Sequence, residues 1–301
     1  GNTILDSSGH PYLFHGIGRD SLEYSCNGDG YFDAQSLAFM GRRGSKTAPG
    51  TYWYANTVRL PLSEAIWLNG QASKGCSAAQ YQSLVKQTVD TLTKMKLNVI
   101  IDLQWSDAGG QASGGAGWEM PDNDSVTFWQ QVAPIYVSYS NVLFELFNEP
   151  HPTRWVCWLK PCTIHNDTSY VSDCNCKQTF TYQSVGMQAL VTAVRNTGAT
   201  NLVIVAGMVW GYDLSRIAQF AIVGSNVVYD THPYPYSNKL PSTWDAAFGN
   251  ISATYPVISA ENGEYDCGTS YMSPLLSYFD AHNISWIGWS WVVIPGAPPC
   301  G

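Results

Sequence analysis

Short apolar runs recur along this chain and alternate with longer segments of mixed polarity. A short apolar run that ends at Gly, Pro, Asn or an acidic residue is typical of a buried β-strand. The most distinct run is Val142-Leu143-Phe144-Glu145-Leu146-Phe147, which stops at Asn148-Glu149-Pro150. The eight predicted strands cover residues 12–16, 57–61, 98–103, 142–147, 202–206, 227–230, 257–260 and 286–290.

The segments between the predicted strands carry helical spacing or turn-forming residues. In residues 79–95 the apolar positions follow helical spacing, at Leu84, Val85, Val89, Leu92 and Met95. Further helices are predicted at 126–139, 182–195 and 271–281, and loops at 18–50, at the Gly-rich 109–117 and at 151–178. Eight strands with such crossovers predict an α/β fold, a parallel (β/α)8 TIM barrel. No linker composition interrupts the chain, so residues 1–301 are expected to form one domain.

Composition narrows the functional classes. The net charge is −8, only 13% of residues are charged and no basic block occurs, which argues against nucleic acid and against an anionic membrane surface as partners. No run approaches the length of a transmembrane helix, and no signal peptide is present; a start at Gly1 suits a processed form. The 12 Trp and 18 Tyr residues suit stacking on sugar rings, although many of them must fill the core.

The eight cysteines indicate an oxidising compartment and thus a secreted, extracellular protein. Cys157, Cys162, Cys174 and Cys176 crowd into one loop, where we expect them to pair with each other and leave the remaining four for other bridges. A zinc site that includes His165 is the alternative, but Cys174-x-Cys176 lacks the usual two-residue gap. Four Asn-x-Ser/Thr sequons, which fit a secreted glycoprotein, begin at Asn123, Asn166, Asn250 and Asn283.

Carboxylates close two of the predicted strands. Glu149 follows the strand at 142–147, and Glu261 follows the strand at 257–260. A carboxylate at a buried strand end is costly to desolvate unless it has partners or a chemical role, and a paired structural Glu is the alternative for Glu149. Because active sites of such barrels lie at the carboxyl ends of the strands, these two side chains are expected to meet. Two facing carboxylates are what retaining glycoside hydrolysis needs.

The order of motifs resembles that of a known family. Asn148-Glu149-Pro150, then His232-x-Tyr234, then Glu261 resemble glycoside hydrolase family 5, the cellulase and mannanase family of retaining (β/α)8-barrel glycosidases. The resemblance covers nearly the whole chain. It implies that Glu149 is the general acid/base and Glu261 the nucleophile, and it implies neither cofactor nor metal.

The resemblance also implies supporting roles at other strand ends. Arg59 and Tyr234 are expected to hold Glu261 ionised, and an interior ion pair between Arg59 and Glu145 is an additional or alternative role. Asn148 is expected to donate to the sugar 2-hydroxyl, and His232 to orient Glu149 or the substrate.

The aromatic floor of the sugar site is expected from Trp289. Trp286 and Trp291 compete for that role, and strand alternation places Trp289 and Trp291 on one face and Trp286 on the other. At the end of the third strand the family usually carries Asp-x-His, whereas this chain reads Asp102-Leu103-Gln104-Trp105. Gln104 and Trp105 are therefore expected to contact substrate in an altered way, which leaves the sugar specificity open.

These observations predict a secreted, monomeric, retaining β-glycoside hydrolase that acts on a β-linked polysaccharide or oligosaccharide. An endo-β-1,4-glucanase is the first expectation. A β-mannanase or an exo-acting β-glycosidase is the alternative, since the loop at 151–178, with Trp155 and Trp158, could block one end of the cleft. A non-catalytic carbohydrate-binding barrel needs the aromatic residues but neither carboxylate.

Overall fold

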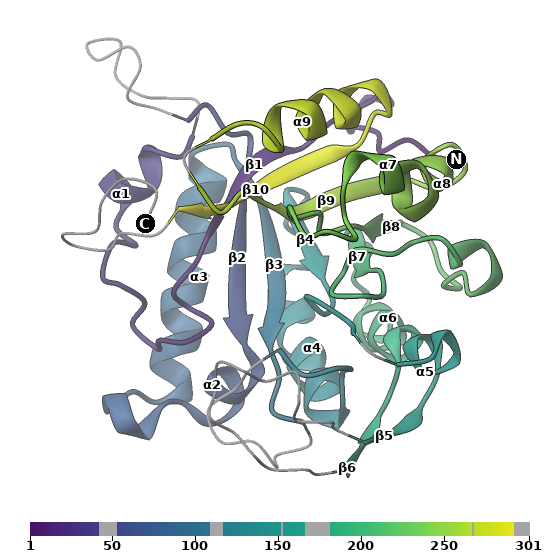
Figure 1. The fold of residues 1–301 in the computed structure, drawn as a ribbon. Helices are drawn as coiled ribbons and strands as arrows, with labels where there is room; N and C mark the ends of the chain where they lie inside the picture. Colours follow the sequence, from purple (N-terminus) through teal and green to yellow (C-terminus); the bar gives the residue numbers. More distant parts are fainter. Residues whose placement is uncertain (42–52, 109–116, 152, 166–180, 267, 292–301) are drawn as a thin grey trace, which may run out of the picture.

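Eight parallel strands close into a barrel in the computed structural model, which describes residues 1–41, 53–108, 117–151, 153–165, 181–266 and 268–291. The strand order around the barrel is β1-β10-β9-β8-β7-β4-β3-β2, and Figure 1 shows helices on its outer side. The (β/α)8 prediction is therefore confirmed, whereas the assignment of all of 1–301 to one domain stays a prediction. The barrel strands are β1 (His15–Arg19), β2 (Thr57–Ser63), β3 (Asn98–Trp105), β4 (Val142–Glu145), β7 (Val203–Ala206), β8 (Val227–Asp230), β9 (Val257–Asn262) and β10 (Ser285–Trp291).

Strand alternation divides each strand between two apolar cores. Outward residues such as Val58, Leu60 and Leu62 pack against the helices in the larger core. Inward residues near the amino ends of the strands form a second core inside the barrel, made of Phe14, Ile100, Leu143, Ile204, Val228, Ile258, Ala260 and Ile287. One inward position further along, β2, β3, β4 and β8 carry charged residues, namely Arg59, Asp102, Glu145 and Asp230. The barrel interior thus changes from apolar to charged toward the carboxyl ends.

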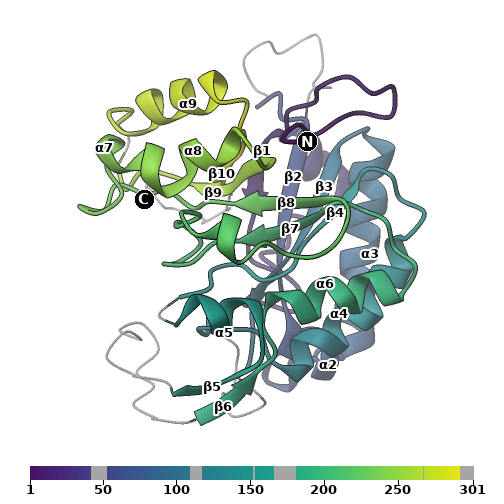
Figure 2. The same ribbon diagram turned by 90° about the vertical axis from the view of Figure 1, so that its right-hand side faces the viewer.

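The longer helices begin at side-chain caps. Ser77 and Gln80 form a capping box at α3, and Asp122 and Ser125 form one at α4. Their apolar faces cover the barrel, and Figure 2 shows α2, α4 and α6 together on one side of it. The helices are α1 (Ala34–Ala38), α2 (Glu64–Asn69), α3 (Ala78–Lys94), α4 (Asn123–Tyr136), α5 (Trp155–Leu159), α6 (Met187–Asn196), α7 (Pro241–Trp244), α8 (Asn250–Ser252) and α9 (Met272–Ala281), with 3-10 turns at Ala72–Lys74 and Ile217–Gln219 and a π-turn at Asp245–Gly249.

Three of the expected boundaries were wrong for identifiable reasons. The first strand begins three residues later than predicted and contains Gly16 and Gly18, which a search for apolar residues does not assign to a strand. A glycine is needed at position 16 because a Cβ there would be 2.4 Å from the Thr57 carbonyl oxygen. β2 continues past Pro61, whose registered partner is Asp102 of β3; the pairing of β2 with β1 has already ended at Arg59. A missing N–H is tolerated there because β2 has one paired neighbour.

The segment after β4 differs most from the prediction. The start of the predicted helix at 182–195 is a strand, β6 (Thr181–Ser184), which pairs antiparallel with β5 (Cys162–His165). Gly186, at φ 73°, separates this strand from α6. Trp155 and Trp158 belong to α5 and are buried, 8% and 0% exposed, so they fill the core instead of facing a cleft.

Two disulfides tie loops at the carboxyl face. Cys157–Cys162 lies within the predicted Cys-rich loop, and Cys26–Cys76 joins the loop after β1 to the segment after α2. The prediction of pairing inside the cluster is confirmed for Cys157 and Cys162. Cys174, Cys176, Cys267 and Cys300 lie outside the described residues, as do residues 109–116 of the Gly-rich loop.

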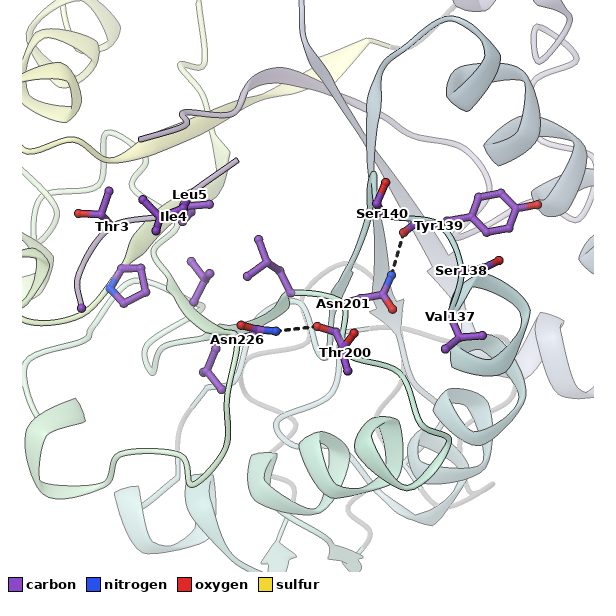
Figure 3. A pocket seen from close by; sticks show the side chains of 15 residues that line it. Thr3, Ile4, Leu5, Val137, Ser138, Tyr139, Ser140, Thr200, Asn201 and Asn226 are labelled. Atoms are coloured by element: carbon purple, nitrogen blue, oxygen red, sulfur yellow. Dashed lines mark hydrogen bonds between the residues drawn. The ribbon is translucent and has the colours of Figure 1, made fainter. Parts of the chain in front are cut away.

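The opposite, amino end of the barrel holds a cavity of about 610 Å³. Figure 3 shows Asn201 and Thr200, before β7, and Asn226, before β8, on its wall, with Thr3 to Leu5 across from them. The side-chain amide of Asn226 bonds to the backbone instead of pointing to a free site, since its Nδ2 donates to the Thr200 carbonyl at 2.8 Å. No carboxylate or imidazole lines this cavity. Within the described ranges, no helix is both long and apolar enough to span a membrane.

The disulfide Cys26–Cys76 is expected to stabilise the fold more than Cys157–Cys162. It closes a loop with a sequence separation of 50 residues, against 5 for the other, and longer closed loops remove more entropy from the unfolded chain. Replacing Cys26 and Cys76 by Ala should lower the free energy of unfolding by about 2 kcal/mol more than the same change at Cys157 and Cys162. Equilibrium unfolding in guanidinium measures both; equal losses would contradict this.

Candidate active site

Arg59 is the centre of the charged layer inside the barrel. Its guanidinium is fully buried and forms a bidentate pair with Glu145, through Nε at 2.7 Å and Nη2 at 2.7 Å. Nη1 donates to Glu261 at 3.0 Å. Nη2 also donates to the Asn148 side-chain oxygen at 2.7 Å and lies 3.0 Å from an Asp102 oxygen. Both expectations for Arg59, the contact with Glu261 and the interior pair with Glu145, agree with this geometry.

The charges around Arg59 do not balance within the cluster. Burial by itself would lower the pKa of Arg59, but Asp102 and Glu145 raise it well above its ordinary value, so the guanidinium keeps its charge. Burial also raises the pKa of Glu145 to about 7, and that of Asp102 well above its ordinary value, against the attraction of Arg59. One guanidinium therefore faces several buried carboxylates, and the charge of His232 also acts to lower the pKa of Asp102 and of Glu145.

A bulge in β9 turns Glu261 into the barrel. Ile258 and Ala260 belong to the interior core, so strict alternation would point Glu261 outward. Between the pairs Trp286↔Ser259 and Gly288↔Asn262, however, β9 advances by one residue more than β10. This extra residue re-aims the next side chain, as β-bulges beside active sites do.

Contacts on both oxygens hold Glu261 in place. Arg59 Nη1 donates to Oε2, and the Tyr234 hydroxyl donates to Oε1 at 2.7 Å. Burial and the charge of Glu261 raise the pKa of Tyr234 well above its ordinary value, so this hydroxyl remains a donor. Asn262 Nδ2 fixes the bulge, since it donates to Ser259 Oγ at 3.0 Å and to the Ile287 carbonyl at 3.1 Å.

Glu149 lies beyond the end of β4, and its side chain is 23% exposed. The ladder continues past the strand, because the Asn148 amide donates to the Leu103 carbonyl at 3.0 Å. His232 Nδ1 lies 3.1 Å from Glu149 Oε1, and His232 Nε2 lies 2.7 Å from Asp230 Oδ2. The expected contact between His232 and Glu149 is thus present.

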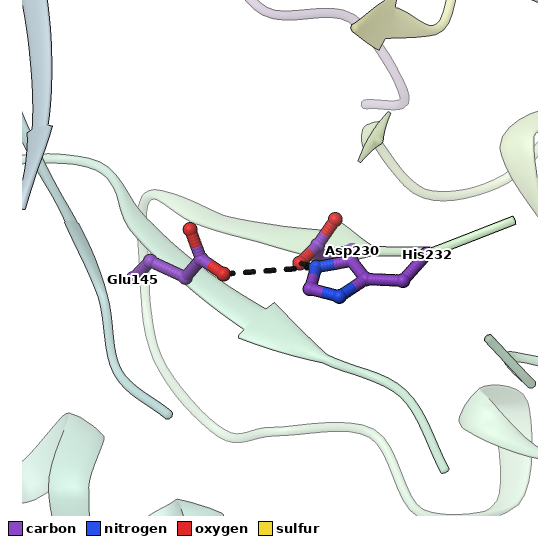
Figure 4. Close-up of side chains that lie close together, drawn as sticks. All are labelled: Glu145, Asp230 and His232. Carbon is purple, nitrogen blue, oxygen red and sulfur yellow. Dashed lines mark hydrogen bonds and ion pairs between the residues drawn. The ribbon is translucent and has the colours of Figure 1, made fainter. Parts of the chain in front are cut away.

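The His232 ring is held from both nitrogens. Figure 4 shows that Asp230 and Glu145 both approach the Nε2 end of the ring, where a Glu145 oxygen lies 3.7 Å from Nε2. Burial lowers the pKa of His232, but Asp230 outweighs that effect and raises the pKa well above its ordinary value. A protonated imidazole donates from both nitrogens, so His232 donates to Glu149 and to Asp230. Asp230 is itself anchored, since its Oδ1 accepts from the Ala260 amide at 2.7 Å.

Gly211 makes room for the His232 ring. Its φ is 71°, and a Cβ there would be 2.8 Å from the ring. The two preceding residues, Val209 and Trp210, also have positive φ, at 61° and 55°. The Trp210 amide donates to the Pro150 carbonyl at 3.0 Å, and the Trp210 ring stacks on His151. The loop after β7 is thereby fastened beside Glu149.

A cavity of about 530 Å³ opens above the two glutamates. An oxygen of Glu149, an oxygen of Glu261 and a ring nitrogen of His232 all lie within 4.8 Å of one another. The remaining walls are mostly aromatic. The lining residues are Glu149, Val209, Trp210, Tyr234, Tyr236, Asn238, Lys239, Glu261, Tyr265 and Trp289.

Among the three tryptophans of β10, Trp289 is the one that lines this cavity. Its ring packs over Gly18, and the Arg59 guanidinium carbon lies 5.8 Å from the ring centre. Trp286 stacks on His15, and Trp291 lies near Phe39 and Trp53, so both pack against the larger core outside the barrel. The expectation that Trp291 shares a face with Trp289 was wrong, because β10 advances by one residue more than β1 between Gly288 and Trp291.

Gln104 and Trp105 lie at the end of β3. Within the described ranges, neither forms a hydrogen bond to Glu149 or Glu261, and Gln104 Oε1 is buried without a partner. The Trp105 ring is 6.1 Å from Tyr24, which follows β1. Next to Tyr24, Glu23 is 4% exposed, and burial raises its pKa to about 8.

Sequence reasoning missed three residues of this region. Asp230 could have been found, because it is two residues before His232 and a strand places both on one face. Lys239 and Glu23 stand in loops without a pattern, so nothing in the sequence distinguished them from surface charges.

Comparisons with known proteins agree with this geometry. The model of the family described as Cellulase (glycosyl hydrolase family 5) matches residues 50–293. An endoglucanase from Clostridium saccharobutylicum is 22% identical over 307 aligned positions, which cover 96% of this chain and 55% of that protein. Endoglucanase A from Evansella cellulosilytica is 23% identical over 240 positions, which cover 72% of this chain and 41% of that protein. The chain therefore spans about half the length of these curated relatives.

Solved structures share the fold at low identity. A β-glucanase from Saccharophagus degradans in complex with cellotetraose has a TM-score of 0.71 and 19% identity, covering 99% of this chain and 84% of that chain. The catalytic domain of an endoglucanase from Thermobifida fusca has a TM-score of 0.66 and 18% identity, covering 97% and 83%. Similarity of this degree shows the common barrel.

Removing the Arg59 charge should destabilise the protein strongly. Arg59→Met leaves Glu145, Asp102 and Glu261 without their buried cation, which should lower the free energy of unfolding by about 3–5 kcal/mol. Arg216→Met is the matched control, because Arg216 bonds to Gln219 at the surface. Denaturant unfolding at neutral pH measures both; equal stabilities of the two variants would contradict the central role of Arg59.

Glu23 should make stability depend on pH. Burial raises its pKa from 4.5 to about 8, so between these values the folded protein holds a proton that the unfolded chain has released. The contribution of protonated Glu23 to the free energy of unfolding is therefore fully present below about pH 4.5. It is lost as the pH rises toward 8, by at most about 1.4 kcal/mol per pH unit. Glu23→Gln should gain stability relative to the unmutated protein from pH 5 to pH 8. A difference that stays constant over that range would show that Glu23 is ionised in the folded state.

Proposed function

The chain belongs to glycosyl hydrolase family 5, and on that premise we propose that it is a retaining endo-β-1,4-glucanase. The activity itself is part of the proposal, because the chain covers only part of its curated relatives. The observation that carries it is the pair of glutamates at the ends of β4 and β9, held by separate partners in one aromatic cavity.

The separation of the two carboxyl groups supports retention of configuration. Retaining enzymes have carboxyl groups about 5–5.5 Å apart, whereas inverting enzymes leave about 6.5–9.5 Å for a water molecule. An oxygen of Glu149 lies within 4.8 Å of an oxygen of Glu261, which is too close for the inverting arrangement. Glu261 is the proposed nucleophile because Arg59 and Tyr234 donate to both of its oxygens and so stabilise its ionised form.

In the proposed first step, a Glu261 oxygen attacks the anomeric carbon of the sugar above Trp289. The bond from that carbon to the leaving oxygen breaks, and its electron pair stays on the oxygen, which takes the proton of Glu149. In the second step, Glu149 removes a proton from water, the water oxygen bonds to the anomeric carbon, and Glu261 leaves as a carboxylate. Two inversions give net retention.

Asn148 and His232 assist these steps through the orientation of their donors. Arg59 can only donate, so its contact with Asn148 Oδ1 directs the Asn148 NH2 group away from the guanidinium. That group is free to donate to the 2-hydroxyl of the reacting sugar, a contact that strengthens in the transition state. His232 donates to Glu149 and so fixes the carboxyl group that must deliver the proton.

The identity of the substrate rests on the relatives. Two of them are named endoglucanases, and a β-glucanase of the same fold was solved with cellotetraose. The Trp289 ring and the open cavity fit a β-linked chain that passes across the site. A panel of carboxymethylcellulose, glucomannan, galactomannan, xylan and aryl glycosides, with product sizes followed over time, tests this. Fastest cleavage of galactomannan, or release of single sugars alone, would overturn the endo-glucanase assignment.

Secretion is proposed on chemical grounds. Disulfides persist in oxidising compartments, and two are formed in the described ranges. The sequon residues Asn123, Asn250 and Asn283 are exposed, as glycosylation requires.

The two glutamates should respond differently to azide. Glu261→Ala removes the nucleophile, so aryl glycosides should react only when azide attacks the anomeric carbon directly, which gives product of inverted configuration. Glu149→Ala should still form the glycosyl-enzyme from an aryl glycoside with a good leaving group, and azide should release it with net retention. Nuclear magnetic resonance of the glycosyl azides reads the configuration. An inverted azide product from Glu149→Ala, or near-normal activity of Glu261→Ala, would show that the roles are assigned wrongly.

A further inference from the structure

Lys239 is a buried cation in the wall of the catalytic cavity. It follows β8 and is 4% exposed, yet it lines the same space as Glu149 and Glu261. The chain around it is fixed, because its carbonyl accepts from Trp244 Nε1 at 3.0 Å and from the Tyr271 hydroxyl at 2.8 Å. The backbone of Lys239 is therefore fixed at the wall of the cavity.

The ammonium group has more donors than the described protein groups use. Nζ donates to the His232 carbonyl at 3.2 Å and more weakly to the Trp210 carbonyl at 3.5 Å. An ammonium has three donors, and these are its hydrogen bonds within the described ranges. The rings of Tyr212 and Tyr236 lie 5.0 and 5.7 Å away and supply no strong acceptor. Burial lowers the pKa of Lys239 to about 8, while the charges of Glu149 and Glu261 oppose that shift.

The position of Lys239 relative to Glu149 decides which part of a substrate it meets. Around the barrel the strands follow the order β10, β9, β8, β7, β4, so Trp289 comes from one side of Glu261, and Lys239 and Trp210 come from the other side, toward Glu149. Lys239 Nζ donates to the Trp210 carbonyl, and the Trp210 amide donates to Pro150 beside Glu149. Since Glu149 protonates the oxygen of the leaving group, the leaving sugar extends past Glu149 toward Lys239.

We propose that Lys239 is a specificity-determining residue that hydrogen-bonds a hydroxyl of the leaving sugar through its third ammonium donor. This inference rests on the proposed retaining function of the same site. A sugar hydroxyl is a good acceptor for the remaining donor of the ammonium, whereas a nitrophenyl leaving group has no hydroxyl and offers only weakly accepting nitro oxygens. Lys239 thus favours cleavage between two sugars over cleavage of a bond to an apolar group.

The first test compares two substrates in Lys239→Met, which keeps the length of the side chain and removes the donors. For cellotetraose, kcat/KM should fall about 10-fold or more, as expected when a hydrogen bond to a charged group is lost. For 2,4-dinitrophenyl β-cellobioside it should change less than about 3-fold, because that leaving group needs no such donor. Lys239→Arg should keep part of the preference. Lys86→Met, a change of the same kind at a surface pair with Asp90, should leave both values unchanged.

The second test uses the reverse direction at the same subsite. A 2-deoxy-2-fluoro-β-cellobioside with an activated leaving group should trap the glycosyl-enzyme, which either water or an added cellobiose then releases. In Lys239→Met, release by cellobiose should slow about 10-fold while release by water is unchanged. Failure of the unmutated protein to form the trapped species would contradict the proposed function. Suppose that the unmutated protein forms the trapped species. If Lys239→Met then slows release by water and release by cellobiose equally, or does not slow release by cellobiose, the role of Lys239 is wrong while the proposed function still holds.

The first part of a third measurement uses only the unmutated protein and therefore gives a result even if Lys239→Met does not fold. Cellobiose acceptors that lack the 2-, 3- or 6-hydroxyl of the attacking ring should release the trapped species of the unmutated protein. One of the three should be about 10-fold slower than cellobiose, and in Lys239→Met the same acceptor should show no further loss. If all three match cellobiose in the unmutated protein, the inference is wrong.

Discussion

The burial of one guanidinium among three carboxylates is the constraint on which the rest of this site depends. Arg59 has no exposed surface, and a charged guanidinium is stable there only because it forms ion pairs with Glu145, Asp102 and Glu261. A planar fork with five donors can satisfy partners from β3, β4 and β9 at once, which an ammonium cannot do. Glu145 takes the bidentate position and so orients the fork, and that orientation directs Nη1 to Glu261.

The barrel makes this cluster possible by separating its interior into two layers. The apolar layer near the amino ends, from Phe14 to Ile287, closes the interior to water below the charges. The charged layer above then has a low dielectric environment, in which each hydrogen bond to an ionised group is stronger and each missing one costs more. The described residues that line the cavity at the amino end include no carboxylate, guanidinium or imidazole, so no comparable charged cluster lies there.

Two hydrogen-bond networks connect the charged layer to the two glutamates, and they differ in kind. Glu261 is held directly by Arg59 and Tyr234, both donors that keep their protons. Glu149 is held through His232, whose proton depends on Asp230. The separate networks give two identical side chains different environments 4.8 Å or less apart, as acid and nucleophile roles require. Lys239 adds a third charged group at the far end of the cavity.

The sequence by itself determined the barrel, the order of its strands and the residues that close them. Alternating polarity and strand ends are local properties, so Arg59, Asn148, Glu149, His232, Tyr234 and Glu261 could be named without coordinates, and the motif order indicated a family. The predicted strand boundaries were wrong where a glycine that allows close backbone contact stands in place of an apolar residue, as at Gly16.

Only the tertiary structure decided which way the key side chains point. The bulge that turns Glu261 inward arises from the register between β9 and β10, and a second irregularity, between β10 and β1, separates Trp289 from Trp291. Lys239 acquired its role because it is buried in the wall of the cavity, although it stands in a loop without a pattern. Register and burial depend on contacts between segments far apart in the chain, and no local pattern of residues encodes them.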